Sequence, residues 1–76
     1  MGIKLPMIKD SELIRALKKL GFFEHRQSGT SHLVMKHADG RRVVVPIHPG
    51  QDIPRGTLKG ILRDCNITNE KFHELL

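Results

Sequence analysis

Residues 22–48, FFEHRQSGTSHLVMKHADGRRVVVPIH, decide the fold because they hold three strand patterns separated by two turn signals. We predict strands over residues 22–27, 31–37 and 41–47. Ser28-Gly29-Thr30 forms the first turn, and Ala38-Asp39-Gly40 contains an Asp-Gly pair that is typical of tight hairpins. Three consecutive valines favour the third strand, and Pro46 indicates its end or an edge. The stretch therefore predicts a three-stranded meander.

Helical patterns flank the meander on both sides. Residues 10–20 have one apolar stripe, with Asp10 or Ser11 as cap and Gly21 as stop. Pro54 suits the first turn of a second helix, which ends near Asn66, and Thr68 caps a short last one. The apolar stripes are Leu13, Ile14, Leu17 and Leu20; Leu58, Ile61, Leu62 and Cys65; and Phe72, Leu75 and Leu76.

These elements predict an α+β fold with the order α-β-β-β-α and a short C-terminal helix. We expect a three-stranded antiparallel sheet with helices on one face and the other face open to water. Residues 1–8 are expected to form a short lead-in, and residues 48–53 a loop. The chain has 76 residues, so residues 1–76 are expected to form a single domain.

Composition narrows the function classes. Thirteen Lys and Arg against eight Asp and Glu give a net charge of +5, which favours a phosphate-bearing partner or an acidic protein surface. The absence of Trp and Tyr argues against a platform that stacks several bases. No apolar run is long enough for a membrane helix, and we expect no leader peptide.

The single cysteine, Cys65, excludes an intrachain disulfide and a cysteine-rich metal site, and fits a reducing, cytoplasmic setting. Its apolar spacing favours a buried hydrophobic role over that of a nucleophile. The five histidines show no helical zinc-binding pair. No glycine-rich phosphate loop and no serine nucleophile elbow is present. We therefore expect neither a metal nor a cofactor.

His32 is the most informative histidine because a flexible turn delivers it to the start of a strand. If Leu33 and Met35 face the core, then His32, Val34 and Lys36 face outward. An exposed imidazole beside cations suits phosphodiester chemistry, since its ordinary pKa near 6.5 lets it exchange a proton near neutral pH. RNA supplies its own nucleophile, the 2′-hydroxyl. On spacing alone, a solvated strand histidine is the favoured alternative.

The other histidines carry weaker signals. His48 follows the third strand and is either a second proton-transfer group or a hydrogen-bond partner that stabilises its loop. His25 and His37 are expected on strands without distinguishing neighbours, and His73 on the solvent side of the last helix.

Basic residues form a second pattern. Arg55, Lys59 and Arg63 repeat every four residues along one face of the second helix. That face is either an ordinary solvated surface or a stripe that follows phosphates, with Arg41 and Arg42 at the hairpin as additions. Arg26 and Lys36 complete the predicted RNA-binding set.

In this order along the chain, several segments resemble the HicA toxin family, the YcfA-like mRNA interferases. The matching segments are Leu20-Gly21-Phe22, Arg26-Gln27-Ser28-Gly29, Ser31-His32, Asp39-Gly40, Val45-Pro46-Ile47-His48, Gly56-Thr57-Leu58 with Ile61-Leu62, Asn66-Ile67-Thr68 and Phe72. The resemblance implies a fold like a double-stranded RNA-binding domain, an mRNA-degrading ribonuclease of a type II toxin–antitoxin system and a HicB-like antitoxin partner.

The resemblance also implies that the strand histidine after the glycine turn is catalytic, which carries over to His32 alone. The family commonly has Gly-Ser-His, whereas this chain has Gly29-Thr30-Ser31-His32, with one extra residue in the turn. The leading hypothesis is a metal-independent endoribonuclease in which His32 is general base or acid. Ser31 would orient His32 or bind phosphate, and His48, His25 or water would take the complementary role. The alternatives are a non-catalytic RNA-binding module and a chain that acts mainly through a protein partner.

Overall fold

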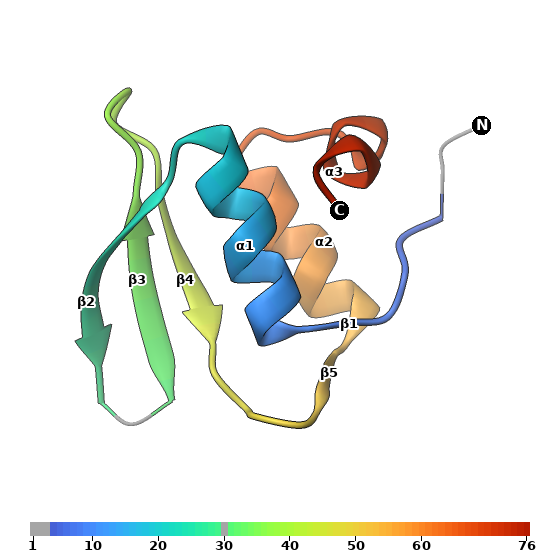
Figure 1. Ribbon diagram of the computed structural model, residues 1–76, viewed down its shortest axis with the longest axis horizontal. Helices are drawn as coiled ribbons and strands as arrows, with labels where there is room; N and C mark the ends of the chain where they lie inside the picture. Colours follow the sequence, from blue (N-terminus) through green and yellow to red (C-terminus); the bar gives the residue numbers. More distant parts are fainter. Residues whose placement is uncertain (1–3, 30) are drawn as a thin grey trace.

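The computed structural model describes residues 4–29 and 31–76 and confirms the predicted α+β fold. All three helices lie on one side of the sheet formed by β2, β3 and β4 (Figure 1). The elements are β1 (Ile8–Lys9), α1 (Asp10–Leu20), β2 (Phe23–Ser28), β3 (His32–Lys36), β4 (Arg42–Pro46), β5 (Asp52–Ile53), α2 (Arg55–Asp64) and α3 (Asn69–Leu75).

The sheet is antiparallel with β3 in the centre. Its register aligns Leu33 with Val45 and Met35 with Val43, and all four side chains belong to the core. Side chains alternate across a strand, so the residues between them face the opposite side. The apolar residues of β3 and β4 therefore face the core together, because inward and outward positions alternate in matching register along both strands.

The core lies between this sheet and the helices. Leu13 and Leu17 of α1 and Leu58 and Leu62 of α2 are almost completely buried in the same cluster as the inward sheet residues. Phe72 brings α3 into this cluster, and α3 packs against α1. Burial of one apolar stripe per helix is the main stabilising contribution expected in a chain of this size.

The helix ends differ in part from the prediction. The residue before the first turn of α1 is Lys9, so the prediction that Asp10 or Ser11 is the cap is wrong. The Lys9 N–H donates to the Glu12 carboxylate at 3.0 Å, which satisfies the start of the helix. Gly21 ends α1 with φ of 109°, and Thr68 caps α3 by accepting from the Lys71 N–H at 3.1 Å. Leu76 is exposed and outside the core.

A short ladder between β1 and β5 was not expected, since its residues were assigned to a lead-in and a loop. Ile8 pairs with Ile53 and both are buried, while the Lys9 ammonium lies 3.3 Å from the Asp52 carboxylate. Two-residue strands are too short to leave a periodic pattern. Thr30 of the predicted first turn lies outside the described residues.

Candidate functional site

The face of the sheet turned away from the helices, called here the outer sheet face, carries His32 and three of the predicted RNA-binding residues. Its cross-strand rows follow from the register. Phe23, Lys36 and Arg42 form one row; Arg26, Val34 and Val44 form the next; and His32 lies opposite Pro46 in the last. One face thus combines a histidine, three cations and apolar side chains.

His32 is the first residue of β3 and is exposed. The backbone on both sides of it is held, because β3 pairs with β2 and β4, and the Ile47 N–H donates to the Ser31 carbonyl at 2.7 Å. The turn before His32 therefore ends in a fixed backbone position. An exposed imidazole on a fixed strand can meet an approaching substrate without a rearrangement of the sheet.

Three of the predicted RNA-binding residues share the face with His32. Arg26 and Arg42 are exposed and Lys36 is half-buried. They come from β2, β4 and β3, so no stretch of sequence shows them as a group; only the register aligns them. Two guanidinium groups, an ammonium and an imidazole on one face create a positive surface that suits a phosphate backbone.

Val34 also faces the outer side, as predicted, yet only 2% of it is exposed. It is absent from the main core cluster and lies in the central strand between Arg26 and Val44. Neighbouring side chains on the outer sheet face, rather than the main core, therefore bury Val34. Phe23 and Val44 remain 49% and 40% exposed there.

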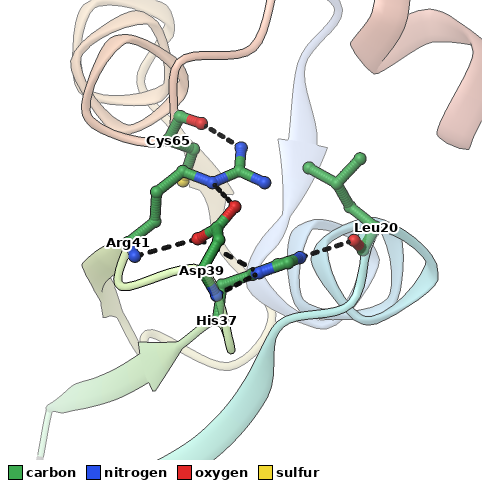
Figure 2. A network of polar contacts seen from close by, with 5 residues as sticks. All are labelled: Leu20, His37, Asp39, Arg41 and Cys65. Atoms are coloured by element: carbon green, nitrogen blue, oxygen red, sulfur yellow. Dashed lines mark hydrogen bonds and ion pairs between the residues drawn. The ribbon is translucent and has the colours of Figure 1, made fainter.

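Arg41 belongs to a structural network rather than to this face (Figure 2). Its Nε donates to Asp39 Oδ2 at 2.8 Å, and its terminal nitrogen donates to the Cys65 carbonyl at 2.6 Å. The guanidinium also lies 5.2 Å from the centre of the Phe22 ring. These contacts join the β3–β4 hairpin to the end of α2. They engage guanidinium N–H groups that Arg41 would otherwise use to bind a phosphate.

His37 is part of the same network, so the expectation that it lies on a strand without distinguishing neighbours is wrong. It follows the end of β3, and its Nε2 donates to the Leu20 carbonyl at 3.0 Å. On the other side of the ring, Nδ1 lies 3.1 Å from both the Asp39 N–H and the Asp39 carboxylate. The ring meets Phe22 edge-on, with centroids 5.1 Å apart.

The Asp39 carboxylate is the negative centre of this network. The backbone N–H of Arg41 donates to it, and the Arg41 guanidinium adds a second hydrogen bond and an opposite charge. These groups hold the pKa of Asp39 below its ordinary value. The network stabilises the tight turn at the Asp39-Gly40 pair, so we assign its residues a structural role.

The cations of α2 lie away from the outer sheet face, because α2 packs on the helical side against β4. Arg55, Lys59 and Arg63 are all exposed, and the Arg55 Nε donates to the Leu5 carbonyl at 2.9 Å. Lys59 and Arg63 border a hollow of about 570 Å³. The predicted RNA-binding set is thus divided between two surfaces, of which only the sheet surface carries His32.

His48 lies beside a smaller hollow of about 240 Å³ that also borders Pro46, the residue opposite His32. The backbone N–H of His48 donates to the Asp10 carboxylate at 2.9 Å. Asp10 is only 8% exposed and also accepts from the Ser11 N–H at 2.7 Å. Asp10 therefore fixes the loop after β4, a role that the sequence pattern at a helix start does not reveal.

The remaining candidates occupy other places. His25 is exposed on β2, where the register with β3 shifts between Glu24 and Arg26. His73 is half-buried, and its Nε2 lies 3.0 Å from the Lys4 carbonyl. Cys65 is buried, and its burial raises the pKa of the thiol to about 11. Among residues 4–29 and 31–76, no three His, Cys, Asp or Glu side chains form a group that could hold a metal ion.

Comparison with known proteins adds one finding. A family model described as the HicA toxin of bacterial toxin–antitoxin systems matches residues 11–67. This range covers α1, the whole sheet and α2, including His32. No curated protein sequence matches the chain. Within the described part of the chain, no helix is both long and apolar enough to cross a membrane.

Proposed function

Because this chain belongs to the HicA toxin family, whose members are toxins of bacterial toxin–antitoxin pairs and generally cleave RNA, we propose that it is an endoribonuclease that acts on mRNA in the cytoplasm. The observation that carries this proposal is the exposed His32 at the fixed start of β3, on the same face as Arg26, Lys36 and Arg42.

The proposed reaction needs proton transfer and charge stabilisation. The 2′-hydroxyl of one nucleotide attacks the adjacent phosphorus, and the bond to the 5′-oxygen of the next nucleotide breaks. His32 either removes the proton of the 2′-hydroxyl or donates a proton to the leaving 5′-oxygen. The products are a 2′,3′-cyclic phosphate and a 5′-hydroxyl, so no water is consumed. The proposed mechanism uses no metal ion, because RNA supplies the nucleophile and His32 transfers the proton.

The other groups have supporting roles in this proposal. Lys36 and the guanidinium groups of Arg26 and Arg42 hold the RNA backbone. Arg26, in the row next to that of His32, stabilises the charge that develops on the phosphate. Ser31, directly before His32, orients it or binds phosphate. The second proton-transfer role falls to water, His48 or His25; His48 is favoured by the hollow it shares with Pro46, next to the His32 row.

The proposed partner is a HicB-like antitoxin with an acidic surface. The net charge of +5 and the cations around His32 fit such a surface, and an antitoxin bound there would cover the catalytic histidine. Inhibition by this partner would then follow from steric exclusion of RNA.

The test is incubation of purified protein with a defined RNA, comparing His32→Ala with His73→Ala. His32→Ala should lose at least about 100-fold in cleavage rate, the size expected for a general acid or base, while His73→Ala on α3 should retain activity. RNA binding by both variants separates catalysis from binding. Equal cleavage by His32→Ala and the parent protein would refute the role of His32, and tight binding without product by the parent would favour the non-catalytic module.

The metal-independent mechanism has its own test. Cleavage of the same RNA in excess chelator should proceed at the rate seen without chelator. A complete loss of cleavage that is restored by a divalent cation would refute this part of the proposal and leave the His32 test unaffected.

A further inference from the structure

The outer sheet face contains an aromatic side chain that neither the core nor the proposed chemistry uses. Phe23 is the first residue of β2 and is 49% exposed, whereas its neighbour Phe22 is buried and contacts His37 and Arg41. Two adjacent phenylalanines therefore have different roles. Phe22 belongs to the fold, and Phe23 presents a ring to solvent.

The neighbours of Phe23 indicate what it contacts. The register places Phe23 directly opposite Lys36, and Lys36 opposite Arg42. Val44 continues the apolar surface and is 40% exposed, with Val34 buried beside it. An exposed aromatic ring with cations in the same row offers a nucleic acid a stacking surface for a base and positive charges for its phosphates.

His32 lies on the same face and on the same strand as Lys36. They are four positions apart, which is about 13 Å along a strand. A base on Phe23 would therefore belong to a nucleotide that flanks the scissile bond. Its binding would set which stretch of RNA lies across His32.

We infer that Phe23 forms a stacking site for one unpaired base of a single-stranded RNA that crosses the outer sheet face toward His32. The inference rests on the proposed function for its substrate class and adds a specificity-determining residue to it. A base can stack on Phe23 only when it is unpaired and turned out of a helix, so the site selects single strands over duplex RNA. One aromatic ring serves one base.

The charge of the face favours RNA over another apolar partner. Three of the side chains that the register brings around Phe23 and Val44 are the cations Arg26, Lys36 and Arg42. An apolar protein surface would have to desolvate these charges without partners, which is costly. A phosphate backbone supplies partners for the cations, and the base supplies a partner for the ring.

The test uses strands that cannot be cleaved, so it does not depend on activity. Short single-stranded 2′-O-methyl RNAs, each with 2-aminopurine at a different position, are titrated with the parent protein and with Phe23→Leu, Phe23→Trp and Met7→Ala. Met7 is 50% exposed outside the sheet and is the matched control. The same strands annealed to a complement give the duplex comparison.

We expect Phe23→Leu to weaken binding of the single strand by about 5- to 100-fold, the range found for loss of a base–aromatic stack. The parent protein should give a stacking-induced fluorescence change at particular positions of the strand only, and Phe23→Leu should abolish it. Phe23→Trp and Met7→Ala should bind like the parent. Leucine preserves an exposed apolar side chain, so the loss would report the ring itself.

Unchanged affinity and fluorescence for Phe23→Leu would overturn the inference. An equal loss of affinity for duplex RNA would also overturn it. So would a Phe23→Leu variant that changes only self-association or the binding of an antitoxin. The proposed function fails separately, if the parent protein binds RNA through Phe23 but does not cleave a strand that carries 2′-hydroxyls.

Discussion

At the residue scale, neighbouring residues of the same type have different roles because of what each one contacts. Arg41 is bound to Asp39 and to the Cys65 carbonyl, whereas Arg42 is exposed in the row of Lys36. Phe22 is buried and Phe23 is half exposed. Residue type and spacing are the same within each pair, so the role is decided by which face of the strand or turn the residue occupies.

Asp10 gives the first prediction at this scale. Asp10→Ala leaves the backbone N–H of His48 without its acceptor in a partly buried position, so it should lower the free energy of unfolding by about 1–3 kcal/mol. Urea denaturation measures this. The control is Asp52→Ala, which removes an exposed ion pair with Lys9 and should cost less than about 1 kcal/mol. Equal losses would contradict the role given to Asp10.

Cys65 gives the second prediction. Burial raises the pKa of its thiol to about 11, so the native protein holds it as an unreactive thiol at pH 8. Alkylation by iodoacetamide at pH 8 should be much slower in the native state than in concentrated urea. The unfolded thiol titrates first, so this burial stabilises the fold fully below pH 9 and less as the pH rises toward 11. Rapid native alkylation at pH 8 would exclude the buried thiol.

At the element scale, the β3–β4 hairpin is held from its closed end. His37 binds the end of α1 through the Leu20 carbonyl, and Arg41 binds the end of α2 through the Cys65 carbonyl. The hairpin is therefore fixed at its closed end, where Figure 2 shows both contacts, and His32 lies at the other end of β3. A fixed hairpin keeps the cations of β3 and β4 aligned on the outer sheet face.

Gly21 tests this attachment. Gly21→Ala adds a Cβ that would lie 2.7 Å from His37 Nε2, in a backbone with φ of 109°. Gly40→Ala has a similar φ of 100° but meets no atom within 4 Å, so it reports backbone strain alone. Both should destabilise the protein by about 1–3 kcal/mol, with Gly21→Ala the larger loss in thermal unfolding. A smaller loss at Gly21 would argue against the packing of His37 on this glycine.

At the scale of the whole molecule, charge is arranged by surface. The outer sheet face carries Arg26, Lys36 and Arg42 together with His32, while the cations of α2 lie on the helical side. The structure therefore offers RNA two separate positive surfaces. Only one of them can place a phosphate beside His32.

The salt dependence of binding tests whether RNA binds to the outer sheet face. The logarithm of RNA affinity falls with the logarithm of salt concentration, and Lys36→Ala should make this slope less negative by about 0.7, the value for one lost phosphate contact on a single strand. Lys71→Ala, an exposed lysine of α3, should leave the slope unchanged. An equal change for both variants would indicate diffuse attraction rather than binding to the outer sheet face.

The stability of the protein in acid tests the network of His37, Asp39 and Arg41. The pKa of Asp39 is lowered in the folded state. The ionised carboxylate therefore stabilises the fold above the ordinary pKa of 3.8, and this stabilisation is lost as the pH falls below that value. The melting temperature of the parent protein should exceed that of Asp39→Asn at pH 6, and the difference should shrink below about pH 4. A difference that grows with acidity would contradict this assignment.

The local pattern was sufficient for the meander and the helices. Alternating apolar residues in β3 and β4, apolar stripes in α1 and α2 and the Asp39-Gly40 turn each depend on neighbours in sequence, and all were found where expected. The β1–β5 ladder and the cap of α1 were missed because they depend on contacts between distant or very short segments. For the candidate site, strand alternation predicted an exposed His32, which the structure confirms.

The sequence by itself therefore determined the order of elements, the residues that face the core and the exposure of His32, because these follow from periodicity along one strand or helix. Only the tertiary structure decided which basic residues accompany His32. Register brought Arg26, Lys36 and Arg42 to its face, hydrogen bonds committed Arg41 to the fold, and packing turned α2 away. Register, long-range hydrogen bonds and helix packing all depend on how separate segments of the chain pair. The spacing of residues within one segment contains no information about that pairing.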